Sequence, residues 1–236
     1  MRVYRRAALS LLGACLLLLG SCERKDERGA RPAGASPVLL SATLDSGDAS
    51  PLRADGAFHE GDVILQTSRS AQSRAIQLAT HSRYSHVGLL HADHGRFSVY
   101  EAVGPVRLTP VESWIARGEG GHFVVLRLKD ADKRLTPETL QRMQDVGRRF
   151  GGKPYDFAFG WSDDRIYCSE LVWKIYREGA GVELGALQRI GEFDLTSPVV
   201  QRALHQRYGD RVPLDEPVIS PGAIAESPLL EKVIEN

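Results

Sequence analysis

Cys168 stands at the start of a segment whose apolar residues have the spacing of a helix. Leu171, Val172, Ile175 and Tyr176 follow it at positions that form one stripe of an α-helix. Backbone N–H groups at a helix N-terminus stabilise a nearby anion, so they lower the pKa of a thiol placed there. Cys168 is therefore a candidate nucleophile, and the competing interpretation is a buried cysteine that only fills the core.

A nucleophilic thiol needs a base within hydrogen-bond reach and a third group that orients the base. The segments 84–90 and 96–102 are predicted strands, and the turn residues between them favour a hairpin. If the loop is Asp93-His94, His86 and Glu101 lie directly opposite each other; if it is His94-Gly95, they are diagonal neighbours on the same face. Both residues stand among apolar neighbours, which favours a functional pair over a surface ion pair.

Other catalytic chemistries find less support in the sequence. His81, His86, His91 and His94 lie close together, but His86 and His91 differ in parity and are expected on opposite faces of their strand. The sequence has no HExxH motif and no paired CxxC motifs, so we expect no metal and no other cofactor. A GxSxG motif, typical of many serine hydrolases, is also missing.

The N-terminus has the pattern of a bacterial export signal. Arginines at positions 2, 5 and 6 precede an apolar run over residues 7–19, which is shorter than the about 20 residues of a bilayer span. The run ends in Leu19-Gly20-Ser21-Cys22, which resembles a lipobox with Cys22 as the lipidated residue. We therefore expect a signal peptide over residues 1–21 and a lipid anchor in the cell envelope. Glu23 follows Cys22, which favours anchoring in the outer membrane.

This processing would leave Cys168 as the one free thiol of an exported protein. Cys15 is lost with the signal and Cys22 carries lipid, and a lone thiol in a compartment that favours disulfides is a candidate reactive group. Residues 22–54 are charged and then rich in Gly, Ala, Ser and Pro, which predicts a flexible tether. Residues 55–236 are then one domain.

The order of the predicted elements indicates the fold class. Strands are expected over 61–66, 84–90, 96–102 and 122–128, whereas helices dominate from residue 135 onward. Thr136 and Pro137 predict a capped helix start, and Gly179 is the expected end of the Cys168 helix. Because strands and helices segregate along the chain, the pattern favours α+β over a doubly wound sheet. The 30 acidic and 30 basic side chains balance, so nothing indicates nucleic-acid binding.

Five segments together resemble a known family. They are GDVIL (61–65), YSHVGLL (84–90), YEA (100–102), GKPYDFAF (152–159) and YCSELVWKIY (167–176). In this order they are similar to the YiiX/YaeF-like bacterial cysteine hydrolases, which are circularly permuted members of the NlpC-type, papain-like superfamily. The permuted order is histidine, acid, cysteine, and this chain matches it with His86, Glu101 and Cys168.

The resemblance implies a fold and a mechanism. The cysteine helix would pack against an antiparallel, barrel-like sheet that carries the histidine and the acid. Cys168 would attack an amide carbonyl and form a thioacyl intermediate, His86 would act as general acid and base, and Glu101 would hold His86. Tyr167 and Tyr155 are candidate oxyanion donors, and Asp156 is a candidate pocket residue; all three can equally be core or turn residues.

The implied substrates are peptide or acyl-amide small molecules, with cell-wall peptides as the leading expectation. The alternatives are an acyltransferase or thioesterase acting on lipids, which related permuted enzymes imply, and a binding module without catalysis. The presence of all three residues of the triad argues against the binding module. The sequence does not indicate the oligomeric state.

Overall fold

The structure, a computed structural model, describes residues 58–236. The predicted signal peptide, Cys22, the whole predicted tether (22–54) and the predicted domain boundary at residue 55 lie outside the described residues. Within 58–236, none of the helices combines the length and the apolar composition needed to cross a membrane.

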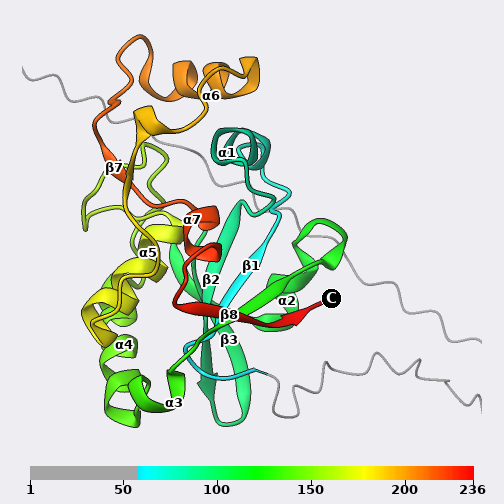
Figure 1. Ribbon diagram of the computed structural model, residues 1–236, viewed down its shortest axis with the longest axis vertical. Helices are drawn as coiled ribbons and strands as arrows, with labels where there is room; N and C mark the ends of the chain where they lie inside the picture. The colour runs from blue at the N-terminus through cyan, green and yellow to red at the C-terminus, as the bar shows by residue number, and fades with distance from the viewer. Residues whose placement is uncertain (1–57) are drawn as a thin grey trace, which may run out of the picture. The chain divides into compact units, whose positions relative to one another are not determined.

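A six-stranded antiparallel sheet forms the centre of the described domain (Figure 1), in the order β4-β3-β2-β1-β5-β8. Each strand contains at least one β-branched residue, a type that suits a pleated, half-buried surface. The bounds of the strands are β1 Val63–Gln66, β2 His86–Asp93, β3 Arg96–Ala102, β4 Val106–Pro110, β5 Val124–Leu128 and β8 Leu230–Glu235. A separate two-stranded sheet pairs β6 (Gln188–Arg189) with β7 (Pro217–Val218).

Most of the helices come from the second half of the chain, as predicted. Their bounds are α1 Ser73–Thr80, α2 Val111–Ala116, α3 Ala131–Arg134, α4 Pro137–Phe150, α5 Cys168–Ile175, α6 Pro198–Tyr208 and α7 Pro221–Ala225. Short 3-10 turns cover Glu119–Gly121 and Ile190–Glu192. The mixture of helices with an antiparallel sheet confirms the α+β prediction.

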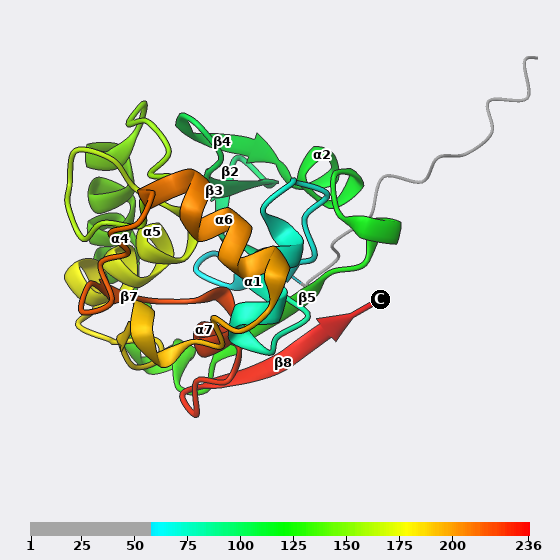
Figure 2. The same ribbon diagram turned by 90° about the horizontal axis from the view of Figure 1, so that it is seen from above.

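Two apolar cores lie on the two faces of the sheet. The larger one packs α4 and α5 against residues such as Val87, Leu89 and Tyr100, while the smaller one packs α2 against residues such as Leu90 and Val99. The alternation along β2 and β3 therefore sends neighbouring residues to different cores. Seen from above, α6 and α1 lie side by side beyond the end of the sheet (Figure 2).

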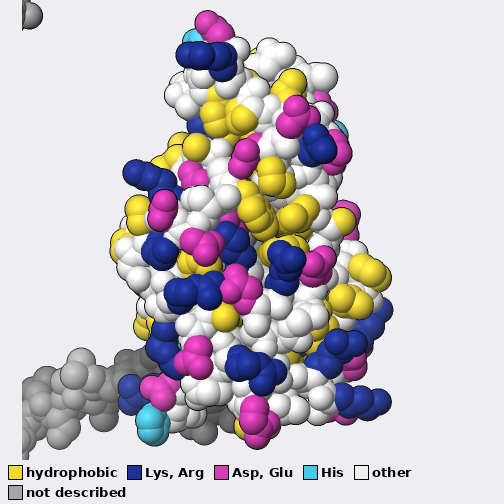
Figure 3. Space-filling model, turned by 90° about the vertical axis from the view of Figure 1, so that its left-hand side faces the viewer, with side chains coloured by type: hydrophobic (Ala, Val, Ile, Leu, Met, Phe, Trp, Pro, Cys, Tyr) yellow, Lys and Arg dark blue, Asp and Glu magenta, His cyan; other side chains and the backbone are white. Residues whose placement is uncertain are grey.

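The face that includes α4 carries charges of both signs. Figure 3 shows Lys and Arg side chains interspersed with Asp and Glu side chains there, around a smaller group of hydrophobic side chains. The buried side of α4, which includes Met143, Val146 and Phe150, is turned toward the core. Thr136 caps this helix by accepting a hydrogen bond from the Thr139 N–H, as its sequence predicts.

Two local predictions were wrong. The Cys168 helix does not end at Gly179: after α5 a π-helical turn covers Tyr176–Ala180, and the residue with a left-handed conformation is Gly181. Gly179 instead permits close packing, because a Cβ atom there would lie 2.5 Å from Met143 Cγ. The second error concerns two strands of the sheet that the sequence did not predict: β4, which follows β3, and β8, with which the C-terminal tail returns to the sheet.

Candidate active site

Cys168 is the first residue of α5 and lies at the end of the helix that faces the sheet. Its side chain is 3 % exposed, and it is the free cysteine of the described chain. The preceding residue, Tyr167, has an extended backbone, and its N–H donates to Glu170 Oε2 at 3.4 Å. The Ser169 hydroxyl donates to the Ile219 carbonyl at 2.7 Å. These contacts fix the start of the helix, and with it the position of the sulfur.

The hairpin of β2 and β3 places His86 beside Glu101. The register pairs Asp93 with Arg96, so the loop is His94-Gly95, the second of the two predicted alternatives. Both loop residues have positive φ angles, 47° and 76°, as in a type I′ turn. His86 and Glu101 are diagonal neighbours on one face, and His86 Nε2 lies 2.7 Å from Glu101 Oε2.

Glu101 is completely buried and has three hydrogen-bond partners, and Arg107 Nε lies 3.9 Å from its Oε1 as well. Besides His86, the Thr109 hydroxyl donates to Glu101 Oε1 at 2.6 Å, and Arg117 Nη2 donates to the same oxygen. Thr109 comes from the adjacent strand β4, and Arg117 follows α2 directly. A buried carboxylate is stable when several donors replace its water. Glu101 therefore stays ionised and can hold the imidazole.

The ring of His86 is held by packing as well as by its hydrogen bond. The fully buried Trp114 of α2 stacks on it, with ring centroids 5.7 Å apart and an interplanar angle of 22°. Gly88 allows Val99 to pack closely against β2 on this face, because a Cβ atom at position 88 would lie 2.2 Å from Val99 Cγ1. With Nε2 bound to Glu101, Nδ1 is the ring nitrogen that remains for Cys168.

The electrostatics favour a thiolate–imidazolium pair. Burial raises the pKa of Cys168, but the hydrogen bond and charge of His86, with the N–H groups of Val87 and Ser169, outweigh it and lower the pKa. Burial lowers the pKa of His86, but Cys168 and Glu101 outweigh it and raise the pKa to about 9. Burial also raises the pKa of Glu101, and its hydrogen bond to His86 contributes to a net lowering.

The Tyr155 hydroxyl interacts with Cys168, and the polarity of its other partners determines whether it is free to donate. Arg207 can only donate, so Gln72 Oε1 must face it, at 3.3 Å, and Gln72 Nε2 must face Tyr155. Nε2 also only donates, so the Tyr155 oxygen accepts this hydrogen bond, at 2.9 Å. The single proton of Tyr155, whose hydroxyl contacts Cys168, remains free to point at the reaction centre.

The other two candidate pocket residues have different surroundings. The Tyr167 hydroxyl accepts the Ile219 N–H at 3.1 Å, which ties the β7 segment to the cysteine helix. Asp156 accepts the N–H groups of Ala158 at 2.8 Å and Gly160 at 2.7 Å, so it shapes the loop. Asp156 is 4 % exposed and borders neither hollow at the site.

Sequence reasoning missed the residues that contact His86 and Glu101. Trp114, Thr109 and Arg117 reach His86 and Glu101 from the segment that follows β3, and no motif marks them. Alternation along β4 could have found Thr109, because it shares the Glu101 face. Gln72 and Arg207 are 135 positions apart in sequence, and only the packing of α1 against α6 brings them together.

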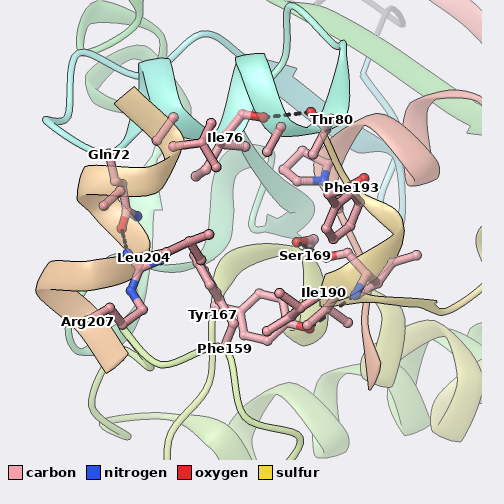
Figure 4. Close-up of a pocket in the computed structure, with 18 of the residues that line it drawn as sticks. Gln72, Ile76, Thr80, Phe159, Tyr167, Ser169, Ile190, Phe193, Leu204 and Arg207 are labelled. Atoms are coloured by element: carbon pink, nitrogen blue, oxygen red, sulfur yellow. Dashed lines mark hydrogen bonds between the residues drawn. The ribbon is translucent and has the colours of Figure 1, made fainter. Parts of the chain in front are cut away.

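Two hollows open at the site. One is a pocket walled mainly by apolar side chains of α1, α6, the segment after β6 and the segment around β7, and Cys168 also lines it. In Figure 4, Gln72 and Arg207 lie on one wall of this pocket and Ile190 and Phe193 on the opposite wall. The other is a cleft of about 740 Å³ with a mixed polar and apolar lining, which borders His86, Arg117 and several serines and glutamines.

Comparison with known proteins agrees with this geometry. Residues 57–234 match the family described as "Permuted papain-like amidase enzyme, YaeF/YiiX, C92 family". The protein YiiX of Escherichia coli (strain K12) is 51% identical over 176 residues, which cover 75% of this chain and 86% of that protein.

A solved structure is also similar. It is titled as the metalloprotein yiiX from Escherichia coli O157:H7, and it matches with a TM-score of 0.72 and 49% identity over 75% of this chain and 97% of that one. Within residues 58–236 no group of three or more His, Cys, Asp or Glu side chains is placed to hold a metal ion. The chain belongs to the YaeF/YiiX family of permuted papain-like cysteine amidases.

Proposed function

We propose that the protein hydrolyses amide bonds with Cys168 as nucleophile, His86 as general acid and base, and Glu101 as the group that orients His86. The 2.7 Å contact between His86 Nε2 and Glu101 Oε2 carries this proposal. Together with the lowered pKa of Cys168, it supplies a thiolate and a protonated imidazole in the resting enzyme. Those are the two groups that amide cleavage through a covalent intermediate requires.

The first half of the reaction forms a thioester. The thiolate of Cys168 attacks the carbonyl carbon, and the carbonyl oxygen becomes an oxyanion. The Cys168 N–H, at the first turn of α5, and the Tyr155 hydroxyl are the donors we assign to this oxyanion. The C–N bond then breaks while His86 transfers its proton to the departing amine. The acyl group remains on sulfur, and the amine leaves.

The second half restores the enzyme. Neutral His86 removes a proton from water, the hydroxide attacks the thioester carbon, and the C–S bond breaks. The products are a carboxylic acid and the Cys168 thiolate beside protonated His86. If an alcohol or amine takes the place of water, the same steps transfer the acyl group.

The apolar pocket beside Cys168 favours an apolar acyl group on the substrate. Ile76, Ile190, Phe193 and Leu204 are among its lining residues, and such a wall binds hydrocarbon by removing it from water. The family resemblance predicts cell-wall peptides as substrates. The apolar pocket supports the alternative, a substrate with a lipid-like acyl chain.

The test compares the two substrate classes directly. Peptidoglycan fragments and N-acyl amides should be incubated with wild type and with Cys168→Ala, and the products identified by mass. Wild type should release an amine and a carboxylic acid from at least one class, and Cys168→Ala from neither. The intact wild-type protein should gain the mass of the acyl group during turnover. Identical products from both proteins would contradict the proposal and favour the non-catalytic binding module.

We also propose that Cys22 anchors the protein to an envelope membrane through lipid. The support is the basic start, the apolar run and the lipobox-like Leu19-Gly20-Ser21-Cys22. Mass spectrometry of the mature N-terminus should find a diacylglyceryl group on Cys22, and Cys22→Ser should release the protein from the membrane fraction. An unmodified N-terminus at another residue would contradict this.

A further inference from the structure

The two hollows at the site contact different members of the triad. Cys168 lines the apolar pocket and not the mixed cleft, whereas His86 lines the cleft and not the pocket. Gln72, Tyr155, Ala203 and Arg207 border both, so they form the ridge between the hollows. The reactive groups thus lie along the boundary between an apolar pocket and a more polar cleft.

The proposed reaction assigns each hollow to one side of the bond that breaks. The acyl carbon becomes bonded to Cys168, so the acyl group lies in the pocket that Cys168 lines. The departing nitrogen receives its proton from His86, so the amine lies in the cleft that His86 lines. The contents of the cleft therefore indicate the chemistry of the leaving amine.

The cleft is positively charged. Its charged lining residues are Arg117 and Arg207, and no Asp or Glu lines it. Arg117 is bound to Glu101, which balances its charge. Arg207 lies 4.4 Å from the Phe159 ring centroid and donates to Gln72, and within residues 58–236 no carboxylate forms an ion pair with it. In the resting enzyme the Cys168 thiolate balances the charge of protonated His86, so Arg207 supplies the net positive charge of the cleft.

From this arrangement, and resting on the proposed function, we infer that the cleft binds a leaving amine that carries an anionic group, a carboxylate or a phosphate, through Arg207. A guanidinium can pair with either anion through two parallel N–H donors. The ridge position of Arg207 places it within reach of groups on the amine side of the scissile bond. The substrate is then an amphiphile: an apolar acyl chain joined by an amide to a small acidic amine.

Three amides with the same acyl chain test the inference. N-decanoylglycine carries a carboxylate, N-decanoyl-phosphoethanolamine carries a phosphate, and N-decanoylglycinamide is neutral. Wild type should show a higher kcat/KM for one or both anionic amides than for the neutral one, and the difference between carboxylate and phosphate identifies the anion. Equal kcat/KM values for all three would overturn the inference.

The Arg207→Gln variant should lower the ratio of anionic to neutral kcat/KM by about tenfold or more, which is the size expected for one lost hydrogen bond to a charged group. The ratio is the readout because Arg207 also orients Gln72. Loss of that hydrogen bond should lower kcat/KM for all three amides alike. Arg207→Lys should retain part of the preference. Arg202→Gln, an exposed arginine of the same helix, should keep the wild-type ratio. An unchanged ratio in Arg207→Gln would contradict the assignment.

Binding separates this inference from the proposed function. Calorimetric titration of Cys168→Ala with the three amides measures the cleft without catalysis. Tighter binding of an anionic amide, lost in Cys168→Ala/Arg207→Gln, supports the inference even if wild type hydrolyses nothing. Hydrolysis without any anion preference leaves the proposed function in place and overturns the inference.

Discussion

Two buried glutamates flank Cys168, and their ionisation differs. Glu101 and Glu170 are both 0 % exposed. Burial raises the pKa of each, but His86, Thr109 and Arg117 produce a net lowering for Glu101. For Glu170, Lys174 and the Tyr167 N–H do not offset burial, and its pKa rises to about 7. Burial alone therefore does not decide ionisation; the number and charge of the donors do.

The two tyrosines beside the cysteine differ in a similar way. Tyr155 accepts from a side chain and keeps its proton for the reaction centre. Tyr167 accepts from a backbone N–H and fastens one segment to another. In the proposed mechanism Glu101 and Tyr155, on the sheet and a loop, take part in the reaction. Glu170 and Tyr167, in and just before α5, instead hold the start of that helix in place. Matched substitutions in the two sets test this division.

The largest effect should come from Glu101→Gln. The amide can donate to His86 Nε2, which would place the ring proton on Nδ1, facing the sulfur, so the imidazole could no longer accept the thiol proton. We expect kcat to fall by about 10⁴-fold, as for the analogous change in a serine-protease triad. Steady-state kinetics measure this, with circular dichroism as the control for folding. A loss of less than about tenfold would contradict the role of Glu101.

Tyr155→Phe should have the next largest effect. It removes the proposed oxyanion donor and keeps the ring, so kcat should fall by about 10²–10³-fold with a small change in KM. The matched change in the supporting set is Tyr167→Phe. If both variants lose activity equally, the division between the two tyrosines is wrong.

Glu170→Gln should leave most of the activity and change how stability depends on pH. The raised pKa of Glu170 means that the folded state binds its proton more tightly than the unfolded state. Its stabilising contribution is therefore greatest below pH 4.5 and decreases until about pH 7. Between pH 5 and 8 the free energy of unfolding should fall in both proteins. The fall should be larger in wild type than in Glu170→Gln, by on the order of 2 kcal/mol. Parallel pH profiles for the two proteins would argue against this shift.

The smallest effect should come from Tyr167→Phe. It removes one acceptor from the buried Ile219 N–H, which should lower the free energy of unfolding by about 1–2 kcal/mol. Urea unfolding measures this change, and kcat should stay within a few-fold of wild type. An unchanged stability would show that water or another group satisfies Ile219.

The sequence was informative where local patterns determine structure. Helical spacing placed Cys168 at a helix start, and turn chemistry placed His86 beside Glu101, with the loop register as the one open choice. It could not reveal Trp114, Arg117 or Arg207, because their positions depend on how separate elements pack. The strand β8 was missed for the same reason: its pairing with β5 joins residues about a hundred positions apart.

The most direct test of the central claim is the pH dependence of Cys168 alkylation by iodoacetamide in the domain from residue 55 onward. In wild type the rate should reach half its plateau well below the pKa of a free thiol, because His86 stabilises the thiolate. In His86→Ala burial remains without that stabilisation, so the midpoint should move to or above the free-thiol value. A wild-type midpoint at the free-thiol value, unchanged in His86→Ala, would contradict the account.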